Sequence, residues 1–379
     1  MARVERVEVR VVGPDVARTT WASMPPQFMA LTIARIWDTD GACGLGASET
    51  YASGAFDLSG YEAARSLAPR LVGEEASLIE ARFRDLQTDV TPGVPGAAAA
   101  LDIALWDLAA KRARLPLYKF LGASRDSIPA YASTPQLDDI PAYLNLVADL
   151  AAEGFGAVKF HAWNYLERDL PMLKAVHAEY GNSALVFMHD AENRYDRYDA
   201  LIVGRALEEM GFRWFEAPFR DYDLYSYRQL RRQVSVPIVP HGLWLSDLCE
   251  IAAYLGQDPW DALRFDTSAV GITVGRKIAA LAEAWAMPVE VQSWGYSLIQ
   301  APNLHMSLSV AGSTYFESPV PYDAYEFGVE NPIRCDSMGF VHPPAGDGLG
   351  LELLWDEIEA ATLAREEITT GVRARELPV

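Results

Sequence analysis

The pattern of apolar and polar positions divides the chain into parts of different character. Residues 4–11 alternate between apolar and polar as a strand does, and residues 28–38 repeat this pattern before the glycine-rich turn GACGLG. Residues 60–122 instead place apolar side chains at helical spacing, most clearly in VPGAAAALDIALWDLAAKRARLPLYKFLG. The first part, residues 1–125, is therefore predicted to be an α+β unit with a small antiparallel sheet.

A different rhythm begins after Ser127, where short apolar or β-branched runs alternate with helical stretches. Eight such runs follow one another before Pro321: IPAYAS, GAVKFHAW, ALVFMHD, FRWFEAP, VPIVPHG, ALRFDTS, MPVEVQS and TYFESP. Strands that alternate with helices in this way are typical of a (β/α)8 TIM barrel. The sequence therefore predicts an α/β barrel domain over residues 126–325.

The last part of the chain, residues 326–379, leaves this rhythm. Its one amphipathic pattern, LELLWDEIEAATLAREEI over residues 351–368, predicts a single helix. We expect this helix to pack on the first unit, so that the C-terminal segment returns to the N-terminal part of the fold.

Charge and cysteine spacing narrow the classes of function. The 379 residues include 52 Asp and Glu against 32 Lys and Arg, a formal net charge of −20, which disfavours a nucleic-acid partner because phosphate binding needs clustered basic residues. The cysteines at positions 43, 249 and 335 lie far apart, so neither a disulfide framework nor a structural zinc site is expected. The chain shows no secretory leader and no apolar run long enough to cross a membrane, so we expect a cytoplasmic protein.

Polar side chains stand at the end of each predicted barrel strand. Active sites of such barrels collect at the C-terminal ends of the strands, whereas the interior is packed with apolar residues. We therefore expect one group of residues to converge on a single face: Lys159, His161, Asp190, Glu216, His241, Asp266, Gln292 and Glu317.

The number of carboxylates in this group indicates a bound cation. With Glu192 included, the carboxylates are too many to remain ionised together without one, and oxygen donors favour a hard ion such as Mg²⁺ over zinc. Asp190 and Glu216 end consecutive strands and form the best ligand pair. The alternative is that single carboxylates are only ion-paired, with Arg194, Arg213 or Arg264 as partners.

Several motifs together resemble a known family. They are the segment AAAALDIALWDLAAKRARLPLYKFLGA, a Lys-x-His strand end, Asp-x-Glu, a Phe-Glu-x-Pro strand end and the segment DTSAVGIT. In this combination the chain resembles the enolase superfamily, in the mandelate racemase/muconate lactonizing branch, over nearly its whole length. The resemblance implies an N-terminal capping domain over the barrel mouth and a Mg²⁺ that binds the carboxylate of a small acid. It also implies abstraction of the α-proton to give an enediolate, and a symmetric homo-oligomer.

The resemblance assigns roles to the residues at the first strand ends. Lys159 matches the first lysine of a Lys-x-Lys pair, and His161 stands where the second lysine commonly acts as the base. Asp190 and Glu216 match the first two metal ligands. The position of the third ligand holds His241 instead of a carboxylate, which leaves three alternatives: His241 binds the metal, Glu192 replaces the missing carboxylate, or the metal site is weakened or lost.

The far side of the implied site is also altered. Asp266 matches the aspartate of an Asp–His dyad, but Gln292 stands where the histidine of that dyad is expected. A glutamine cannot transfer a proton, so an orienting hydrogen bond to the substrate is the better interpretation of Gln292. Glu317 matches a glutamate that donates a hydrogen bond to the substrate carboxylate as the enediolate forms.

Aromatic residues directly after strand ends are candidates for the wall of a substrate pocket, although they are equally common as plain packing: Trp163, Trp244, Trp294 and Tyr296. The segment from Met24 to Phe28 and the stretch around Tyr51 fall where the resemblance implies specificity loops, whereas Glu49 is expected to be structural. His189 adjoins Asp190 on a strand and should therefore point away from the barrel interior.

Three functions fit these residues. The first is dehydration of a sugar acid, an aldonate or aldarate, in which one base removes the α-proton and the β-hydroxyl leaves. The second is isomerisation by a racemase, epimerase or cycloisomerase, of which Gln292 disfavours the first two because they need proton carriers on both faces. The third is a non-catalytic relative that binds a carboxylate.

Overall fold

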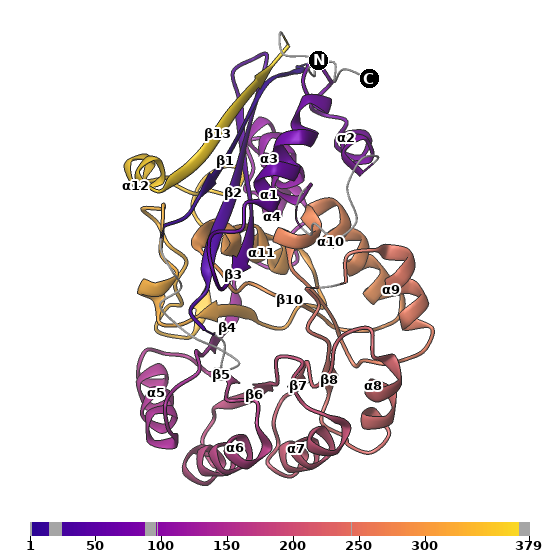
Figure 1. Cartoon of the computed structure of the whole chain (residues 1–379), viewed down its shortest axis with the longest axis vertical. Coiled ribbons are helices and arrows are strands. Elements are labelled where there is room, and N and C mark those ends of the chain that lie inside the picture. The colour runs from indigo at the N-terminus through magenta and orange to yellow at the C-terminus, as the bar shows by residue number, and fades with distance from the viewer. Residues whose placement is uncertain (1, 15–24, 88–95, 97, 244, 371–379) are drawn as a thin grey trace.

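A four-stranded antiparallel sheet forms one end of the molecule (Figure 1). The computed structural model describes residues 2–14, 25–87, 96, 98–243 and 245–370. The alternating N-terminal segments form strands as predicted, and the order across the sheet is β13 (Thr362–Thr369), β1 (Val4–Val12), β2 (Phe28–Asp38) and β3 (Cys43–Ala52). Val7 and Val9 face the main core, whereas Leu31 and Ile33 belong to a second apolar cluster, so both faces of this sheet are covered.

Helices cover the face of the sheet that carries Val7 and Val9. They are α1 (Ser59–Leu67), the 3₁₀ turn η1 (Ala68–Arg70) and α3 (Ala99–Arg112), and the helices α2 (Ile79–Gln87) and α4 (Leu117–Phe120) pack beside α3. Helix α3 lies so close to β3 that a Cβ at Gly44 or Gly46 would stand 2.0 or 2.1 Å from a carbonyl oxygen of the helix. The glycine-rich turn of the sequence therefore provides the close contact between strand and helix.

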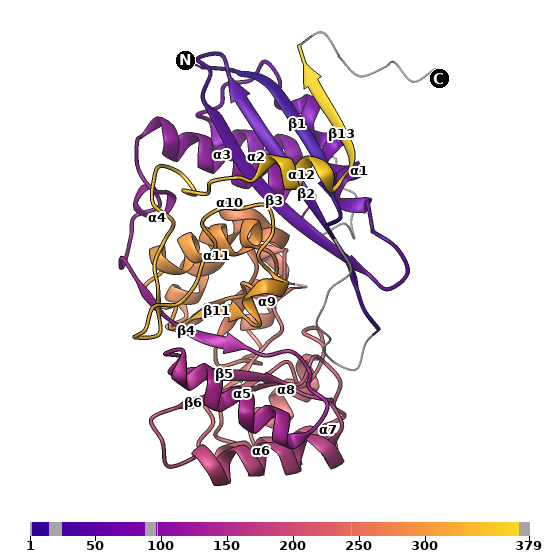
Figure 2. The same ribbon diagram turned by 90° about the vertical axis from the view of Figure 1, so that its left-hand side faces the viewer.

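The C-terminal segment is not the single helix that its amphipathic pattern predicts. Helix α12 covers only Trp355–Ala360, and the chain then extends into β13, which pairs antiparallel with β1 from Thr362 to Thr369. Without β13 the backbone N–H and C=O groups along one edge of β1 would be unpaired, and strand pairing satisfies them. The segment does return to the N-terminal unit, as expected, and Figure 2 shows α12 and β13 alongside the sheet.

All eight predicted barrel runs form parallel strands. They are β4 (Ile128–Ser133), β5 (Ala157–His161), β6 (Val186–Asp190), β7 (Phe215–Glu216), β8 (Ile238–Val239), β9 (Leu263–Phe265), β10 (Val289–Val291) and β11 (Phe316–Pro319). Six pair in the order β11-β4-β5-β6-β7-β8 and the other two pair as β10-β9. Hydrogen bonds from Asp261 N to Ile238 O at 2.9 Å and from Val289 N to Gly312 O at 3.3 Å connect the two groups. The short strand β12 (Phe340–Val341) pairs antiparallel with β4.

The barrel helices follow their strands and surround them (Figures 1 and 2). They are α5 (Ile140–Ala152), α6 (Leu166–Tyr180), α7 (Arg197–Glu209), α8 (Leu224–Arg231), α9 (Leu248–Leu255), α10 (Thr267–Ala284) and α11 (Ser297–Ser309), followed by the 3₁₀ turn η2 (Tyr322–Ala324). Aspartate side chains accept hydrogen bonds from the first-turn N–H groups of five of them, at Asp139, Asp196, Asp223, Asp247 and Asp266. Among the described residues, no helix is both long and apolar enough to span a membrane.

Buried polar contacts lock the N-terminal unit onto the barrel. Asp102 of α3 accepts hydrogen bonds from the backbone N–H and the hydroxyl of Thr273 in α10, at 2.8 and 2.6 Å. His305 of α11 accepts a hydrogen bond from Tyr118 N at its Nδ1, at 3.1 Å, and its Nε2 lies 3.2 Å from Leu349 O. The resulting fold is a modified (β/α)8 TIM barrel with an N-terminal capping domain.

The two contacts of His305 predict how the stability of the fold depends on pH. Burial disfavours the charged ring and lowers the pKa of His305 to about 4. The neutral ring is also the form that accepts the hydrogen bond from Tyr118 N at Nδ1. The folded-state pKa of His305 lies below the unfolded value of about 6.5. The stabilisation that comes from keeping His305 neutral is therefore complete above pH ~6.5 and is lost as the pH falls toward 4. When the pH is lowered from ~7.5 to ~5.5, the free energy of unfolding of the wild type should therefore fall by about 1.4 kcal/mol more than that of His305→Gln.

Chemical denaturation at the two pH values measures this difference. His177→Gln, the same change on the partly exposed α6, is the control and should follow the wild type. Equal drops for His305→Gln and the wild type would show that His305 is not held neutral.

Candidate functional site

A cavity of about 320 Å³ lies between the capping domain and the C-terminal ends of the barrel strands. Gln27 and Tyr51 of the capping domain line it on one side. Most of the residues that the sequence places in the site line the other sides: Lys159, His161, Asp190, Glu192, His241, Gln292, Trp294 and Glu317. The predicted convergence of strand ends is therefore present in the fold, and the capping domain closes it.

Two predicted pocket residues do not line this cavity. Trp163 is buried, with its ring edge-on to Tyr143 at 5.3 Å between centroids and the Arg168 guanidinium 4.0 Å from its own ring. Tyr296 packs against Phe327 at 5.7 Å. Their predicted place in the pocket wall is therefore corrected, because each ring packs on neighbours outside this cavity. Met24 and Trp244 lie outside the described residues.

Lys159 is the central cation of the site. Only 1% of its side chain is exposed, and its Nζ lies 3.1 Å from Asp190, 2.9 Å from Glu216 and 2.9 Å from Glu317. Burial disfavours the charged ammonium, but the opposing charges of Glu216 and Glu317 raise the pKa of Lys159 well above its usual value. Lys159 therefore stays protonated and holds three strand ends together.

Arg264 adds a second buried cation, which the sequence suggested only as an alternative partner. Its Nε lies 3.1 Å from Glu216 Oε1, and its Nη2 donates to Glu317 Oε2 at 2.8 Å. Trp214 Nε1 also donates to Glu216 Oε2 at 3.2 Å. Although burial raises the pKa of Glu317, Lys159 and Arg264 outweigh it and hold that pKa well below its usual range. Both carboxyl groups thus lie against cations of the chain, but for Glu216 burial outweighs the cations and raises its pKa to about 7.

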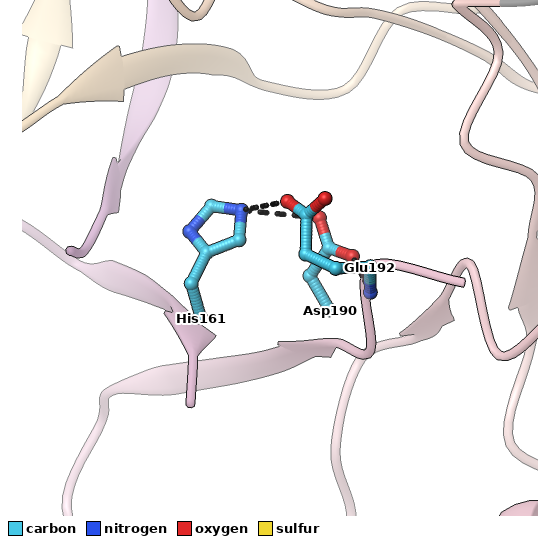
Figure 3. A group of neighbouring side chains, drawn as sticks. All are labelled: His161, Asp190 and Glu192. Atoms are coloured by element: carbon cyan, nitrogen blue, oxygen red, sulfur yellow. Dashed lines mark hydrogen bonds and ion pairs between the residues drawn. The ribbon is translucent and has the colours of Figure 1, made fainter. Parts of the chain in front are cut away.

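A second cluster shares Asp190 with that of Lys159 and lies at the wall of the cavity, where His161 faces two carboxylates (Figure 3). Its Nε2 lies 3.2 Å from Asp190 Oδ2 and 3.2 Å from Glu192 Oε1, while its Nδ1 lies 2.7 Å from Thr134 O. Burial lowers the pKa of His161, but the hydrogen bonds to both carboxylates outweigh it and raise the pKa to about 10. In this arrangement the imidazole carries a proton.

The backbone after β6 explains how Glu192 reaches His161. Glu192 and Asn193 both adopt left-handed backbone conformations, with φ of 49° and 61°, which residues other than glycine rarely adopt. The turn is held by Asp190, whose Oδ1 accepts a hydrogen bond from Glu192 N at 2.9 Å. The strained turn brings the Glu192 carboxylate back over the end of β6, beside Asp190.

His241 approaches the same cluster from the loop after β8. Asp221 accepts hydrogen bonds from the backbone N–H groups of His241 and Gly242, at 2.8 and 3.0 Å. Gly242 has φ of 84°, and a Cβ there would lie 2.5 Å from Arg264 O, so only glycine fits. This loop places His241 Nε2 3.8 Å from Glu192 Oε2.

Among the described barrel residues, the wall beside β10 carries no Asp–His pair. Gln292 lines the cavity, and its buried Oε1 makes no hydrogen bond within the described part of the chain. Asp266 does not line it: its Oδ1 accepts hydrogen bonds from Ser268 N at 2.7 Å and from Asn303 Nδ2 at 2.9 Å, which caps α10. Burial raises the pKa of Asp266 to about 6. The predicted His189 orientation is confirmed, because its ring stacks on Phe215 outside this cavity.

The donor atoms of the inner cluster fit a divalent cation. His161, Asp190 and Glu192 each offer one ligand atom, and these atoms lie within 4.8 Å of one another. Glu216, which the sequence pairs with Asp190, is not part of this group and contacts Lys159 and Arg264 instead. The described residues therefore favour Asp190 with Glu192 as the carboxylates that would hold a cation, with His241 next to them.

Gln27 belongs to the segment from Met24 to Phe28 that the resemblance implied as a specificity loop, whereas sequence reasoning missed two contributors to the cavity, Asn193 and Leu243. Each lies in a loop, where the alternation of strands and helices gives no signal. Arg194 also lines the cavity, although the sequence suggested it only as an ion-pair partner.

Comparisons with known proteins agree with this architecture. Residues 6–122 match the model for the mandelate racemase/muconate lactonizing enzyme N-terminal domain, and residues 142–357 match the enolase C-terminal domain-like model. A crystal structure from Pseudovibrio sp., described as a mandelate racemase/muconate lactonizing enzyme, superposes with a TM-score of 0.94 at 34% identity, covering 97% of this chain and 99% of that one.

Characterised enzymes are among the relatives. L-talarate/galactarate dehydratase of Salmonella typhimurium is 33% identical over 59% of this chain and 58% of its own length. Its structure liganded with Mg and L-lyxarohydroxamate has a TM-score of 0.86 at 26% identity and covers 97% of this chain and 95% of that one. The 3,6-anhydro-α-L-galactonate cycloisomerase of Streptomyces coelicolor is 30% identical over 77% of this chain and 80% of its own length.

The ion pairs of Arg264 predict a large effect on stability. In Arg264→Met the side chain keeps its approximate length, but Glu216 and Glu317 lose a buried cation. Removal of one partner of a buried ion pair typically lowers the free energy of unfolding by about 3–5 kcal/mol. Arg6→Met, which breaks an exposed pair with Glu367, is the control and should cost less than about 1 kcal/mol. Chemical denaturation distinguishes the two, and equal small losses would contradict a structural role for Arg264.

Proposed function

Because the chain belongs to the mandelate racemase/muconate lactonizing enzyme family of the enolase superfamily, we propose that it dehydrates a sugar acid. The reaction removes the proton α to the carboxylate and eliminates the β-hydroxyl as water. One observation carries the proposal: a cavity of sugar-acid size holds the base candidate His161 next to Asp190, Glu192 and the buried cation Lys159.

We infer that Asp190 and Glu192 hold Mg²⁺, as the donor set and the Mg-bound structures of relatives support. Mg²⁺ held there would supply positive charge beside the substrate carboxylate, and that charge would oppose the two carboxylates that favour protonated His161. His241, at 3.8 Å from Glu192, is the candidate for the altered third ligand position.

The chain's own residues then divide the remaining tasks. Lys159 faces the cavity and keeps Glu317 ionised and in place, so the inner end of the pocket has fixed charges around the substrate carboxylate. Neutral His161 accepts the α-proton at Nε2, and its Nδ1 contact with Thr134 O fixes the ring orientation. Gln292 offers an amide to a substrate hydroxyl. Capping-domain residues Gln27 and Tyr51 help to exclude water.

Dehydration is preferred over racemisation because the second wall has no competent proton carrier in the position of Gln292. A cycloisomerase would need only one α-proton transfer, and one relative catalyses such a reaction. The products separate the two: a dehydratase releases a 2-keto-3-deoxy acid, whereas a cycloisomerase releases an isomer of its substrate.

A screen of sugar acids tests the proposal. Galactarate, L-talarate, galactonate, arabinonate and gluconate are incubated with the protein and Mg²⁺, and 2-keto acid formation is measured as the semicarbazone. We expect turnover of at least one acid, and loss of that turnover in excess chelator with recovery on addition of Mg²⁺. Isomers without keto acid would favour a cycloisomerase. Binding without exchange of the α-proton or product would indicate a non-catalytic relative, and activity that resists the chelator would contradict the metal role.

A variant of the base gives a second test. His161→Asn keeps a polar side chain but removes the proton acceptor, so exchange of the substrate α-proton with solvent deuterium should fall by about 100-fold or more. Binding of the acid, measured calorimetrically, should change by less than about 10-fold, since Lys159 and the carboxylates remain. His342→Asn, at a surface pair with Asp336, is the control. Unchanged exchange in His161→Asn would exclude His161 as the base.

A further inference from the structure

The capping domain places a phenol on the wall that lacks a barrel acid. Tyr51 of β3 lines the cavity, and its ring lies 5.7 Å from that of Trp294, which follows β10. His161, by contrast, ends β5, and strands β4 and β11 separate it from β10 on the shorter way around the barrel. Tyr51 and His161 therefore approach the cavity from separate walls.

Behind Tyr51 lies a buried carboxyl group. The Tyr51 hydroxyl is hydrogen-bonded to Glu49, whose Oε2 is buried and has no partner among the described residues. A Cβ at Gly295 would lie 2.5 Å from Glu49 Oε1, so the backbone of the loop after β10 closes tightly over the carboxyl group. Glu49 is thus enclosed between Tyr51 and the barrel, away from the cations Lys159 and Arg264, with which it forms no ion pair in the described chain.

This environment favours the protonated acid. Burial, reinforced by the nearby charge of Asp266, raises the pKa of Glu49 well above its usual value. A carboxylic acid and a phenol are each donor and acceptor, so the proton between them can be passed in either direction. The pair can therefore supply one proton to the cavity through the Tyr51 hydroxyl.

We propose that Tyr51 is the general acid that protonates the departing β-hydroxyl, with Glu49 as its proton donor. This inference rests on the proposed dehydration. His161 takes the α-proton, the electron pair of the enediolate forms the new C=C bond, and the C–O bond to the β-hydroxyl breaks. The departing oxygen takes the Tyr51 proton and leaves as water, and Glu49 returns a proton to the phenolate. The enol product becomes the 2-keto acid, His161 releases the α-proton to solvent, and Glu49 takes a proton back from solvent.

A leaving group that needs no proton isolates this step. The acid that the wild type dehydrates is compared with its analogue that carries fluorine in place of the β-hydroxyl. For Tyr51→Phe we expect dehydration to fall by about 100-fold or more, while fluoride release and α-proton exchange stay within about 3-fold of the wild type. Tyr118→Phe removes another phenol of the capping domain that is bonded to a carboxylate, Asp126, and as the matched control it should change neither rate.

The outcomes are distinct. Equal losses with both leaving groups would overturn the inference and make Tyr51 a binding or structural residue, as would unchanged dehydration. If the wild type itself neither exchanges the α-proton nor forms a product from any acid, the proposed function fails, and the inference with it.

Glu49 is a positioning residue that acts through Tyr51, and its protonation has a signature independent of activity. The infrared spectrum of the wild type at neutral pH should show the carbonyl stretch of a buried carboxylic acid, and Glu49→Gln should lose it. Glu62→Gln, at an exposed pair with Arg65, is the control. Absence of a Glu49-dependent band would overturn the proton-donor role, even if Tyr51→Phe behaved as expected.

Discussion

The interaction on which the rest of the site depends is the contact of one buried ammonium with three carboxylates. Lys159 brings together the ends of β6, β7 and β11, with Nζ to oxygen distances of 2.9 to 3.1 Å. A buried charge without partners costs several kcal/mol, so each member of this cluster requires the others. Arg264 completes the balance at Glu216 and Glu317. This constraint fixes the positions of strand ends that would otherwise repel one another.

The same constraint resolves how an acidic protein can bind a small acid. The net charge of −20 belongs to the whole chain, whereas the barrel mouth contains two permanent cations and a protonated histidine. Lys159 and Arg264 both contact Glu216 and Glu317, whereas Asp190 contacts Lys159 alone of these cations. Asp190 and Glu192, which both face His161, are therefore the carboxylates that we propose for a divalent cation. In this proposal the left-handed turn at Glu192 supplies the carboxylate that is absent at the third ligand position, where the chain has His241.

The capping domain contributes chemistry as well as closure. Its strand β3 carries Glu49 and Tyr51 to the wall where the barrel has Gln292 and where the described barrel residues include no histidine. The contacts of Asp102 with Thr273 and of His305 with Tyr118 hold this domain in register with the barrel. A loss of barrel acid–base groups can therefore be offset by a residue that arrives from another domain.

The sequence by itself determined the eight strands, the helices between them and the polar residue at each strand end, because these follow from local periodicity. It was wrong about residues 351–368, where pairing with β1 depends on a strand far away in the chain. It predicted Asp190 and Glu216 as a pair of metal ligands. Only the tertiary structure decided that Arg264 pairs with Glu216 and that Glu192 turns toward His161. The physical reason is that the positions of residues at strand ends determine which side chains come together at the barrel mouth. Which of these side chains pair with each other depends on backbone turns, burial and charge balance in three dimensions.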